Sequence, residues 1–154
     1  MKKAMIICGF PGVGKSCVAN NRTNILDAES SVFSWIFDPE TAEKPKRNHE
    51  FPSNYIRYIK ENMGRYDFIL VSSHQNVRES LMAEGIQYII VAPQKELKNE
   101  YLIRYLQRGN EIEFIELLNE KWDLFLDGIN NDGAPVIYLN KGEYVSDVLG
   151  AIAR

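Results

Sequence analysis

Residues 4–16 read AMIICGFPGVGKS, and this stretch decides the fold. Its first five residues form a continuous apolar run that ends at Gly9, which predicts a β-strand buried on both faces. A helix is expected next, over residues 14–21. The glycine-rich residues between them therefore form the turn from a buried strand into a helix.

This turn matches the pattern GxxxxGK[ST], the Walker A motif, from Gly9 to Ser16, in the strand-to-helix context that the motif requires. Glycines let successive backbone N–H groups curl around phosphate groups, and the following helix presents the positive end of its dipole. Lys15 is expected to bridge the β- and γ-phosphates, and the Ser16 hydroxyl to ligate Mg²⁺. We therefore predict that the chain binds ATP. The residues expected to contact it are Gly9, Pro11, Gly12, Val13, Gly14, Lys15, Ser16 and Cys17.

Beyond the turn, apolar runs alternate with segments of helical periodicity, which is typical of βαβ units and a parallel sheet. Further strands are expected at 24–27, 68–72, 87–92 and 135–139, and helices at 51–63, 77–84, 96–107, 111–126 and 144–153. A turn-rich segment is expected at 128–134. Residues 38–50 contain two prolines and no large apolar side chain, so we expect a surface loop there.

Composition limits the class of protein. The 154 residues are 45% hydrophobic and 25% charged, with a net charge of −3, which argues against broad binding to nucleic acid or to an anionic membrane. Cys8 and Cys17 cannot build a disulfide framework and lack zinc-ligand spacing. The apolar run at the start is too short for a signal peptide, and no stretch approaches the ~18 residues of a membrane span. We expect a single domain over 1–154 and a cytoplasmic protein.

In its loop and its order of elements, the chain resembles the P-loop kinase superfamily, which includes nucleoside monophosphate kinases of the adenylate-kinase type, shikimate- and gluconate-kinase-like enzymes and polynucleotide 5′-kinases. The resemblance implies a three-layer α/β/α fold with a parallel five-stranded sheet of order 2-3-1-4-5. It also implies an acceptor-binding region at about 30–64 and a basic lid at about 95–111. The activity it implies is Mg²⁺-dependent transfer of the γ-phosphate of ATP to a small acceptor.

Acidic residues follow the second expected strand, where Asp27 ends the strand and Glu29 comes two residues later. Carboxyl ends of strands in open α/β sheets face the crevice where ligands bind. The resemblance implies that Asp27 orients Mg²⁺ or takes a proton from an acceptor hydroxyl, with Glu29 close by. The alternative is a solvated helix cap, because Asp27 and Ser30 are both good capping residues.

Two arginines, Arg104 and Arg108, lie four residues apart on the helix after the fourth strand. The resemblance implies that they are lid arginines that close on the triphosphate, and a planar, always-charged guanidinium suits a transferring phosphoryl group. The alternative is an exposed helix flank in which Glu100 and Glu111 are their partners.

The acceptor side is implied by the resemblance alone. Residues near the end of the third strand would contact the acceptor, and an arginine would hold its anionic group. An aromatic ring would stack on a base, and a lysine after the fifth strand would pack over adenine. The residues at these places are Trp35, Arg57, Ser73, His74, Arg78 and Lys141. Core packing of Trp35 and a structural role for His74 are the alternatives.

No acidic residue stands at Ser72 or Ser73, where a Walker B acid is expected, and this favours a kinase over a motor-type or AAA ATPase. We expect the acceptor to be a nucleoside monophosphate or a deoxynucleotide. The alternatives are a hydroxyl acceptor (a nucleoside, a sugar acid or a polynucleotide 5′-end) and an ATP-binding switch protein that transfers nothing. We expect a monomer or a small homo-oligomer.

Overall fold

The computed structural model describes residues 3–20, 22–36 and 46–152. Its elements in chain order are β1 (Met5–Gly9), α1 (Lys15–Asn20), β2 (Ile25–Asp27), α2 (Ser31–Ser34), β3 (Trp35–Ile36), β4 (Lys46–Arg47), α3 (Ser53–Asn62), β5 (Phe68–Ser72), α4 (Gln75–Ala83), β6 (Tyr88–Pro93), the 3-10 turn η1 (Lys95–Leu97), α5 (Lys98–Gln107), α6 (Ile112–Asn130), β7 (Val136–Leu139) and α7 (Val145–Ile152). Within the described ranges, no helix is long and apolar enough to cross a membrane.

A parallel five-stranded sheet forms the centre of the molecule, with the order β2-β5-β1-β6-β7. The predicted α/β class and all-parallel sheet are confirmed. Among the strands of this sheet alone, the order is second, third, first, fourth and fifth along the chain. The remaining strands, β3 and β4, pair antiparallel with each other outside it.

The central position of β1 explains its apolar sequence. Ile6, Ile7 and Cys8 are fully buried, because β5 and β6 flank the strand and helices cover both of its faces. Gly9, the last residue of β1, lies opposite Ser72 on one side and Val91 on the other. The loop after β1 therefore starts level with the carboxyl ends of both neighbouring strands.

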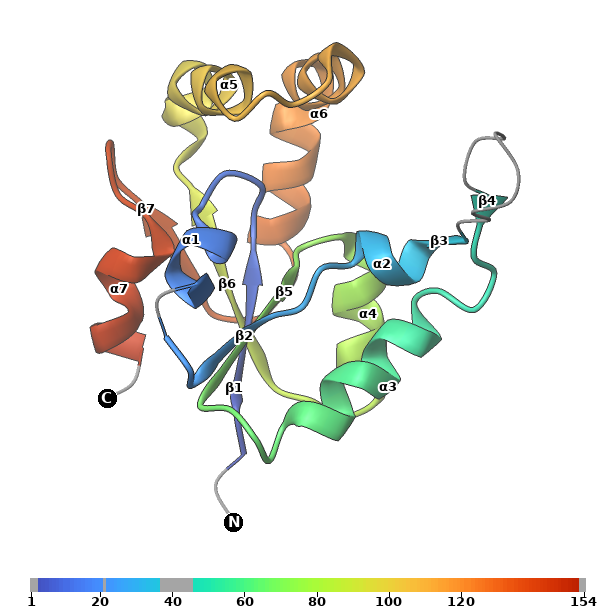
Figure 1. Cartoon of the computed structure of the whole chain (residues 1–154). Coiled ribbons are helices and arrows are strands. Elements are labelled where there is room, and N and C mark those ends of the chain that lie inside the picture. The colour runs from blue at the N-terminus through green and yellow to red at the C-terminus, as the bar shows by residue number, and fades with distance from the viewer. Residues whose placement is uncertain (1–2, 21, 37–45, 153–154) are drawn as a thin grey trace.

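Helices cover the sheet on two sides. Figure 1 shows α1 and α7 on one side and α3 and α4 on the other. The loop after β1 arches over the carboxyl ends of the strands, and α5 and the first half of α6 lie at this same end (Figure 1). Ligands in open α/β sheets bind at this end, so α5 and α6 are placed to border a site there.

Several sequence predictions differ from the structure. Helix α6 continues to Asn130 instead of ending at 126, because Ile129 is a further buried position of its apolar stripe. The turn predicted at 128–134 therefore begins only after α6. The loop predicted at 38–50 lies partly outside the described residues, and its part at 46–47 forms β4 against β3. Helix α4 begins at Gln75, two residues earlier than expected.

Candidate active site

The loop between β1 and α1 is compact and closes on its own lysine. Gly12 and Gly14 have φ values of +93° and +91°, a conformation that L side chains rarely adopt. A Cβ on Gly12 would also come within 3.0 Å of the rings of Tyr101 and Tyr105. The Nζ of Lys15 donates a hydrogen bond of 2.8 Å to the carbonyl oxygen of Gly9. Backbone and lysine thus form the curled arrangement that the motif predicts.

The charge of Lys15 is set by its surroundings. Burial lowers the pKa of its ammonium group to about 8, and the charge of Arg108 acts in the same direction. The carboxylates of Asp27 and Glu29 oppose this shift. An anion such as a triphosphate would favour the charged form of Lys15 in the same way that these carboxylates do.

Asp27 and Ser16 form a pair of oxygen donors beside the loop. The Oδ1 atom of Asp27 is buried and has no hydrogen-bond partner among the described residues. Burial and the nearby Glu29 raise the pKa of this carboxyl, whereas Lys15 and a hydrogen bond with the Ser16 side chain lower it. An unpartnered buried carboxylate oxygen costs free energy, and a cation would satisfy it.

This oxygen pair fits Mg²⁺. The ion takes oxygen ligands and is usually bound through one or two carboxylates together with substrate phosphates and water. The part of the chain that the structure describes holds no group of three or more His, Cys, Asp or Glu side chains suited to a metal. A Mg²⁺ site completed by phosphates requires no such group, so Ser16 and Asp27 are the residues that would hold the ion.

Arg104 is bonded to the backbone of the loop itself. Its side chain is only 8% exposed, and its Nη1 donates to the carbonyl oxygen of Gly12 at 2.8 Å. Its Nη2 donates to the carbonyl oxygen of Glu143 and to Glu100 Oε2, both at 3.0 Å. These contacts correct the sequence prediction of an open lid arginine, because in this structure the guanidinium is bound to protein acceptors.

Aromatic rings complete this support of the loop. The guanidinium carbon of Arg104 lies 4.3 Å from the ring centroid of Tyr101 and 4.0 Å from that of Tyr144. The hydroxyl of Tyr105 donates to the carbonyl oxygen of Pro11 at 2.8 Å. Helix α5 thus holds two backbone carbonyls of the loop. Both rings are also fully buried in the core, and helical spacing alone does not reveal that they cover the loop.

Arg108 is placed differently from Arg104. It follows the last residue of α5, is exposed, and lines the cavity described below. Its charge acts on Lys15. The alternative interpretation paired the two arginines with Glu100 and Glu111, and Glu100 is the partner of Arg104 alone. Arg108 therefore keeps the position expected of a lid arginine.

On the acceptor side, Arg78 is paired within the protein. Its Nε donates to the carbonyl oxygen of Ser73 at 2.9 Å, and its Nη1 forms an ion pair with Asp132. Both side chains are 7% exposed, and the second oxygen of Asp132 accepts a hydrogen bond of 2.7 Å from the Tyr88 hydroxyl. This corrects the prediction of a free anion clamp, because a carboxylate already neutralises the guanidinium. No sequence signal pointed to Asp132, which lies 54 residues away.

A cavity of ≈ 1130 Å³ lies over the loop. The loop, the end of β5, the start of α4 and helices α5 and α6 border it. The predicted site residues that line it are Gly9, Pro11, Gly12, Gly14, Lys15, Ser16, Cys17, Glu29, Ser73, His74, Arg78, Arg104 and Arg108. The structure therefore brings most of the predicted site together around one space.

Five predicted residues lie outside this lining. One is Asp27, the last residue of β2, although the next residue, Ala28, lines the cavity. Val13 is fully buried, and its carbonyl oxygen accepts a hydrogen bond from the Val145 backbone. Trp35 lies against Arg47, whose guanidinium carbon is 4.9 Å from the ring centroid. Arg57 and Lys141 are exposed on α3 and on the β7–α7 loop. The structure therefore does not bring Trp35, Arg57 or Lys141 to the cavity.

The lining also contains residues that sequence reasoning missed. Tyr144 borders the cavity beside Gly14, where an added Cβ would lie 2.9 Å from its ring. Helix α6 contributes a group of large apolar side chains: Phe114, Leu117, Leu118, Leu124 and Phe125. Helical spacing predicts Ile115, Leu118, Trp122, Phe125 and Leu126 as the apolar stripe of this helix, and it gives no sign that the helix borders a cavity.

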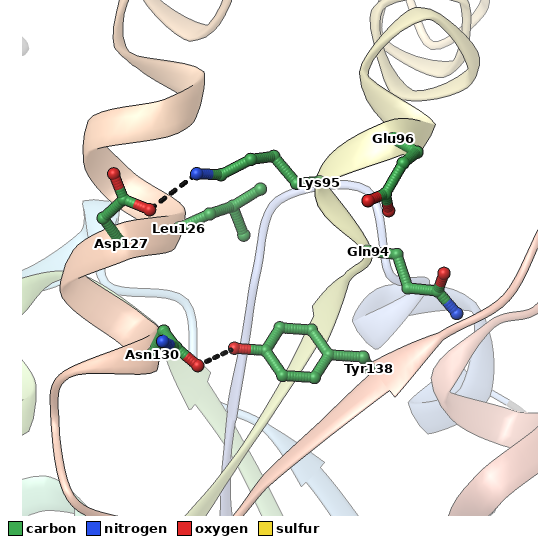
Figure 2. A pocket seen from close by; sticks show the side chains of 7 residues that line it. All are labelled: Gln94, Lys95, Glu96, Leu126, Asp127, Asn130 and Tyr138. Carbon is green, nitrogen blue, oxygen red and sulfur yellow. Dashed lines mark hydrogen bonds and ion pairs between the residues drawn. The ribbon is translucent and has the colours of Figure 1, made fainter.

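A second, smaller hollow of ≈ 270 Å³ lies between η1, α6 and β7. Figure 2 shows Lys95 and Asp127 paired across it, with their charged atoms 2.6 Å apart, and the Tyr138 hydroxyl bonded to Asn130. It contains no glycine-rich loop, and the one lysine and one aspartate in its lining are paired with each other. We therefore place the candidate active site at the larger cavity.

The larger cavity thus combines a curled glycine-rich loop, its lysine and an exposed arginine, with an oxygen pair suited to Mg²⁺ beside it. Comparison with known proteins adds no family to this description: no protein-family model matches the chain, and no curated protein matches it.

Proposed function

We propose that the chain is a small Mg²⁺-dependent phosphotransferase of the P-loop kinase type, with the three-layer α/β/α fold of that superfamily. It would move the γ-phosphate of ATP to a nucleotide acceptor, a nucleoside monophosphate or a deoxynucleotide. One observation carries the proposal. The loop at 9–16 is curled, with the Lys15 ammonium bonded to the carbonyl oxygen of Gly9, and it ends beside Ser16 and Asp27 at the carboxyl edge of a parallel sheet.

The residues of the loop and its neighbours have different roles in the proposed phosphoryl transfer. Lys15 neutralises the β- and γ-phosphates, and Ser16 and Asp27 hold Mg²⁺, which supplies positive charge to the phosphate oxygens. Arg108 stabilises the negative charge of the transition state from the exposed side. Arg104 and Tyr105 act as positioning residues, since they fix the backbone carbonyls of Gly12 and Pro11. Catalysis would come from placement and electrostatics.

The size of the cavity supports a reaction with two substrates. Pockets for a single drug-sized ligand measure about 300–1000 Å³. The space over the loop is ≈ 1130 Å³ and is bordered both by the loop and by the end of β5. A nucleoside triphosphate and a small acceptor can therefore lie in one cavity.

A panel assay tests the proposed function. The protein is incubated with MgATP and a set of nucleoside monophosphates, nucleosides and sugar acids, and ADP is followed by a coupled assay. We expect ADP production that depends on one class of acceptor. Intact ATP binding without acceptor-dependent ADP for any member of the panel would contradict a kinase and favour the switch protein.

A second candidate, a kinase for a hydroxyl acceptor, has an observation in its favour. The arginine expected to hold an acceptor phosphate, Arg78, is paired with Asp132. At the same time Asp27 has a raised pKa and an unpartnered oxygen, and both suit a base that takes a hydroxyl proton. A phosphate acceptor needs no such base.

Asp27→Asn separates these two acceptor classes. We expect the substitution to abolish transfer to a hydroxyl, and to weaken transfer to a phosphate acceptor only through poorer Mg²⁺ binding. The measurement is kcat over a range of Mg²⁺ concentrations. Excess Mg²⁺ restores activity that is lost through weaker metal binding, but it does not replace a missing base. Asp123→Asn, at an exposed position of α6, is the matched control.

A further inference from the structure

Gly128 lies in the last turn of α6, where the backbone does not require a glycine. Its φ is not among the positive glycine values of the structure. Within a helix, glycine costs stability relative to alanine, because it has more conformational freedom to lose on folding. The residue is exposed and lines the large cavity. The reason for a glycine at this position therefore lies in the cavity and not in the helix.

The space in front of Gly128 is bordered by the guanidinium of Arg78, on α4. A Cβ atom on Gly128 would lie 3.8 Å from Nη2 of Arg78, and apart from α6 itself no other atom of the described residues would be within 4 Å of it. This distance is an ordinary van der Waals contact, so a methyl group would fit there without a clash. Both residues line the cavity. We call the space that the missing side chain leaves beside Nη2 the Gly128 gap.

Arg78 has one donor group that the protein leaves unused. Its Nε donates to the carbonyl oxygen of Ser73 at 2.9 Å, and its Nη1 is paired with Asp132. Among the described residues, Nη2 has no hydrogen-bond partner, although the side chain is only 7% exposed. Polar groups that are this deeply buried are nearly always hydrogen-bonded. A ligand in the cavity can supply the missing acceptor atom through the Gly128 gap.

The charges around Nη2 determine which kind of acceptor atom fits. The carboxylate of Asp132 neutralises the guanidinium, and both side chains are 7% exposed, so the pair offers N–H donors without a net positive charge. An anionic oxygen would lose its hydration on entering the gap and would gain little attraction in return. A hydroxyl or carbonyl oxygen loses less hydration and accepts the same hydrogen bond.

We infer that the Gly128 gap is a subsite in which Nη2 of Arg78 donates a hydrogen bond to an uncharged hydroxyl or carbonyl oxygen of the acceptor. This inference rests on the proposed function and deepens it, because it assigns a specificity-determining residue and the part of the acceptor that it meets. Gly128 acts by leaving room, and Arg78 acts by donating. The acceptor therefore places an uncharged part between α4 and α6, while its reacting group lies toward the loop at 9–16.

Gly128→Ala tests the subsite, because it fills the gap and improves the helix at the same time. The protein is saturated with Mg²⁺ and a non-hydrolysable ATP analogue, and adenosine, thymidine, gluconate, shikimate and inorganic phosphate are titrated by calorimetry. The four organic probes carry uncharged oxygens, and phosphate serves as the anion. We expect Gly128→Ala to weaken the binding of each organic probe that binds wild type about tenfold or more. Its affinities for phosphate and for the ATP analogue should stay unchanged, and its melting temperature should rise by about 2–4 °C.

Gly150 provides a matched control on α7. Like Gly128, it is exposed and third from the end of its helix, but its Cβ position meets no neighbouring atom and it does not line the cavity. Gly150→Ala should therefore give a similar rise in melting temperature with no change in binding. Gly128→Ser is a second variant, since its hydroxyl would both fill the gap and accept from Nη2. It should weaken binding at least as much as Gly128→Ala.

Binding at the gap and phosphoryl transfer can fail separately. The subsite is overturned, even if transfer is found, by unchanged probe binding in Gly128→Ala, by an equal loss in Gly150→Ala, or by an equal loss of affinity for inorganic phosphate. Failure of every organic probe to bind wild type, or a lower melting temperature for Gly128→Ala, would overturn it as well. Gap-dependent binding without any transfer would support the subsite and overturn the proposed kinase reaction.

Discussion

At the scale of single residues, the charge of Lys15 makes the loop sensitive to pH. Burial lowers the pKa of this group to about 8 from its ordinary value of 10.5. Between these two values the unfolded chain binds more protons than the folded chain, so the contribution of Lys15 makes stability rise with pH across this window. ATP affinity should change in the opposite direction, because above about pH 8 more of the free protein holds a neutral amine.

Two measurements on wild type and Lys15→Met test these opposite pH dependences of stability and of ATP affinity. Urea unfolding between pH 7.5 and 10 should show a gain in stability for wild type relative to the variant, and calorimetry should show weaker ATP binding above pH 8. Lys60→Met is the control, since this exposed lysine pairs with Glu84 on the surface. An ATP affinity that is the same at pH 7 and pH 9.5 would contradict the assignment.

The buried pair of Arg78 and Asp132 leads to a prediction about stability. Asp132→Asn leaves an uncompensated guanidinium in the interior, and we expect a loss of about 3–5 kcal/mol of unfolding free energy. Glu84→Gln breaks the exposed pair with Lys60 and should change it by less than about 1 kcal/mol. Chemical denaturation measures both. A stable Asp132→Asn variant with tighter binding of an anionic acceptor would instead return Arg78 to the role of an acceptor clamp.

At the scale of elements, α5 holds the loop through Arg104 and Tyr105, and Arg108 follows its last residue. Arg104→Ala removes the bond to Gly12 and the ring contacts, so we expect a loss of about 2–3 kcal/mol of stability and a higher KM for ATP. Arg108→Ala lies at an exposed position and should leave stability within about 0.5 kcal/mol, while kcat falls about a hundredfold or more.

Urea unfolding and steady-state kinetics on both variants test this division of roles. The same fall in kcat for both arginines, with stability unchanged in both, would show that Arg104 leaves Gly12 during the reaction and acts as a second lid arginine. Tyr105→Phe, which removes only the hydroxyl bonded to Pro11, should resemble a mild form of the Arg104 variant.

An element could be predicted from the sequence where a contiguous stretch of residues carries its pattern. Strands β1, β5, β6 and β7 are mainly apolar runs, and the loop at 9–16 is a contiguous motif, so these could be located without a structure. Strands β3 and β4 have two residues each, too few to show a pattern. The end of α6 was predicted too early because Gly128 reads as a helix stop, whereas Ile129 is buried and packing extends the helix.

The site residues divide in the same way. Lys15, Ser16 and Asp27 could be predicted because the motif and the strand end place them locally. The partners of Arg78 and Arg104 come from distant parts of the chain. Arg78 binds Asp132, which is 54 residues away, and Arg104 binds Glu143 and Gly12, which are 39 and 92 residues away. Sequence spacing shows that an arginine is present and does not show which acceptor it meets.

At the scale of the whole molecule, a net charge of −3 conceals a cationic site. The order β2-β5-β1-β6-β7 brings the loop after β1 beside the end of β5, and α5 and α6 return over the same edge. Lys15, Arg78 and Arg108 therefore border one cavity, although they come from separate parts of the chain. Asp132 is paired with Arg78, and Glu29 also lines the cavity. Lys15 and Arg108 are therefore the cations of this set that have no ion pair among the described residues and can meet an anionic ligand.

The central claim is that this cavity transfers the γ-phosphate of ATP to an acceptor, and following that phosphate tests the claim most directly. The protein is mixed with Mg²⁺, ATP labelled in the γ-phosphate and a set of nucleoside monophosphates and nucleosides, and the label in each product is counted. Our account predicts that the label moves to one nucleobase-bearing acceptor with an equal amount of ADP formed. Lys15→Ala should reduce this transfer about a thousandfold, and Lys60→Ala should leave it unchanged. Label that stays in ATP, or that appears only as inorganic phosphate, would contradict the account.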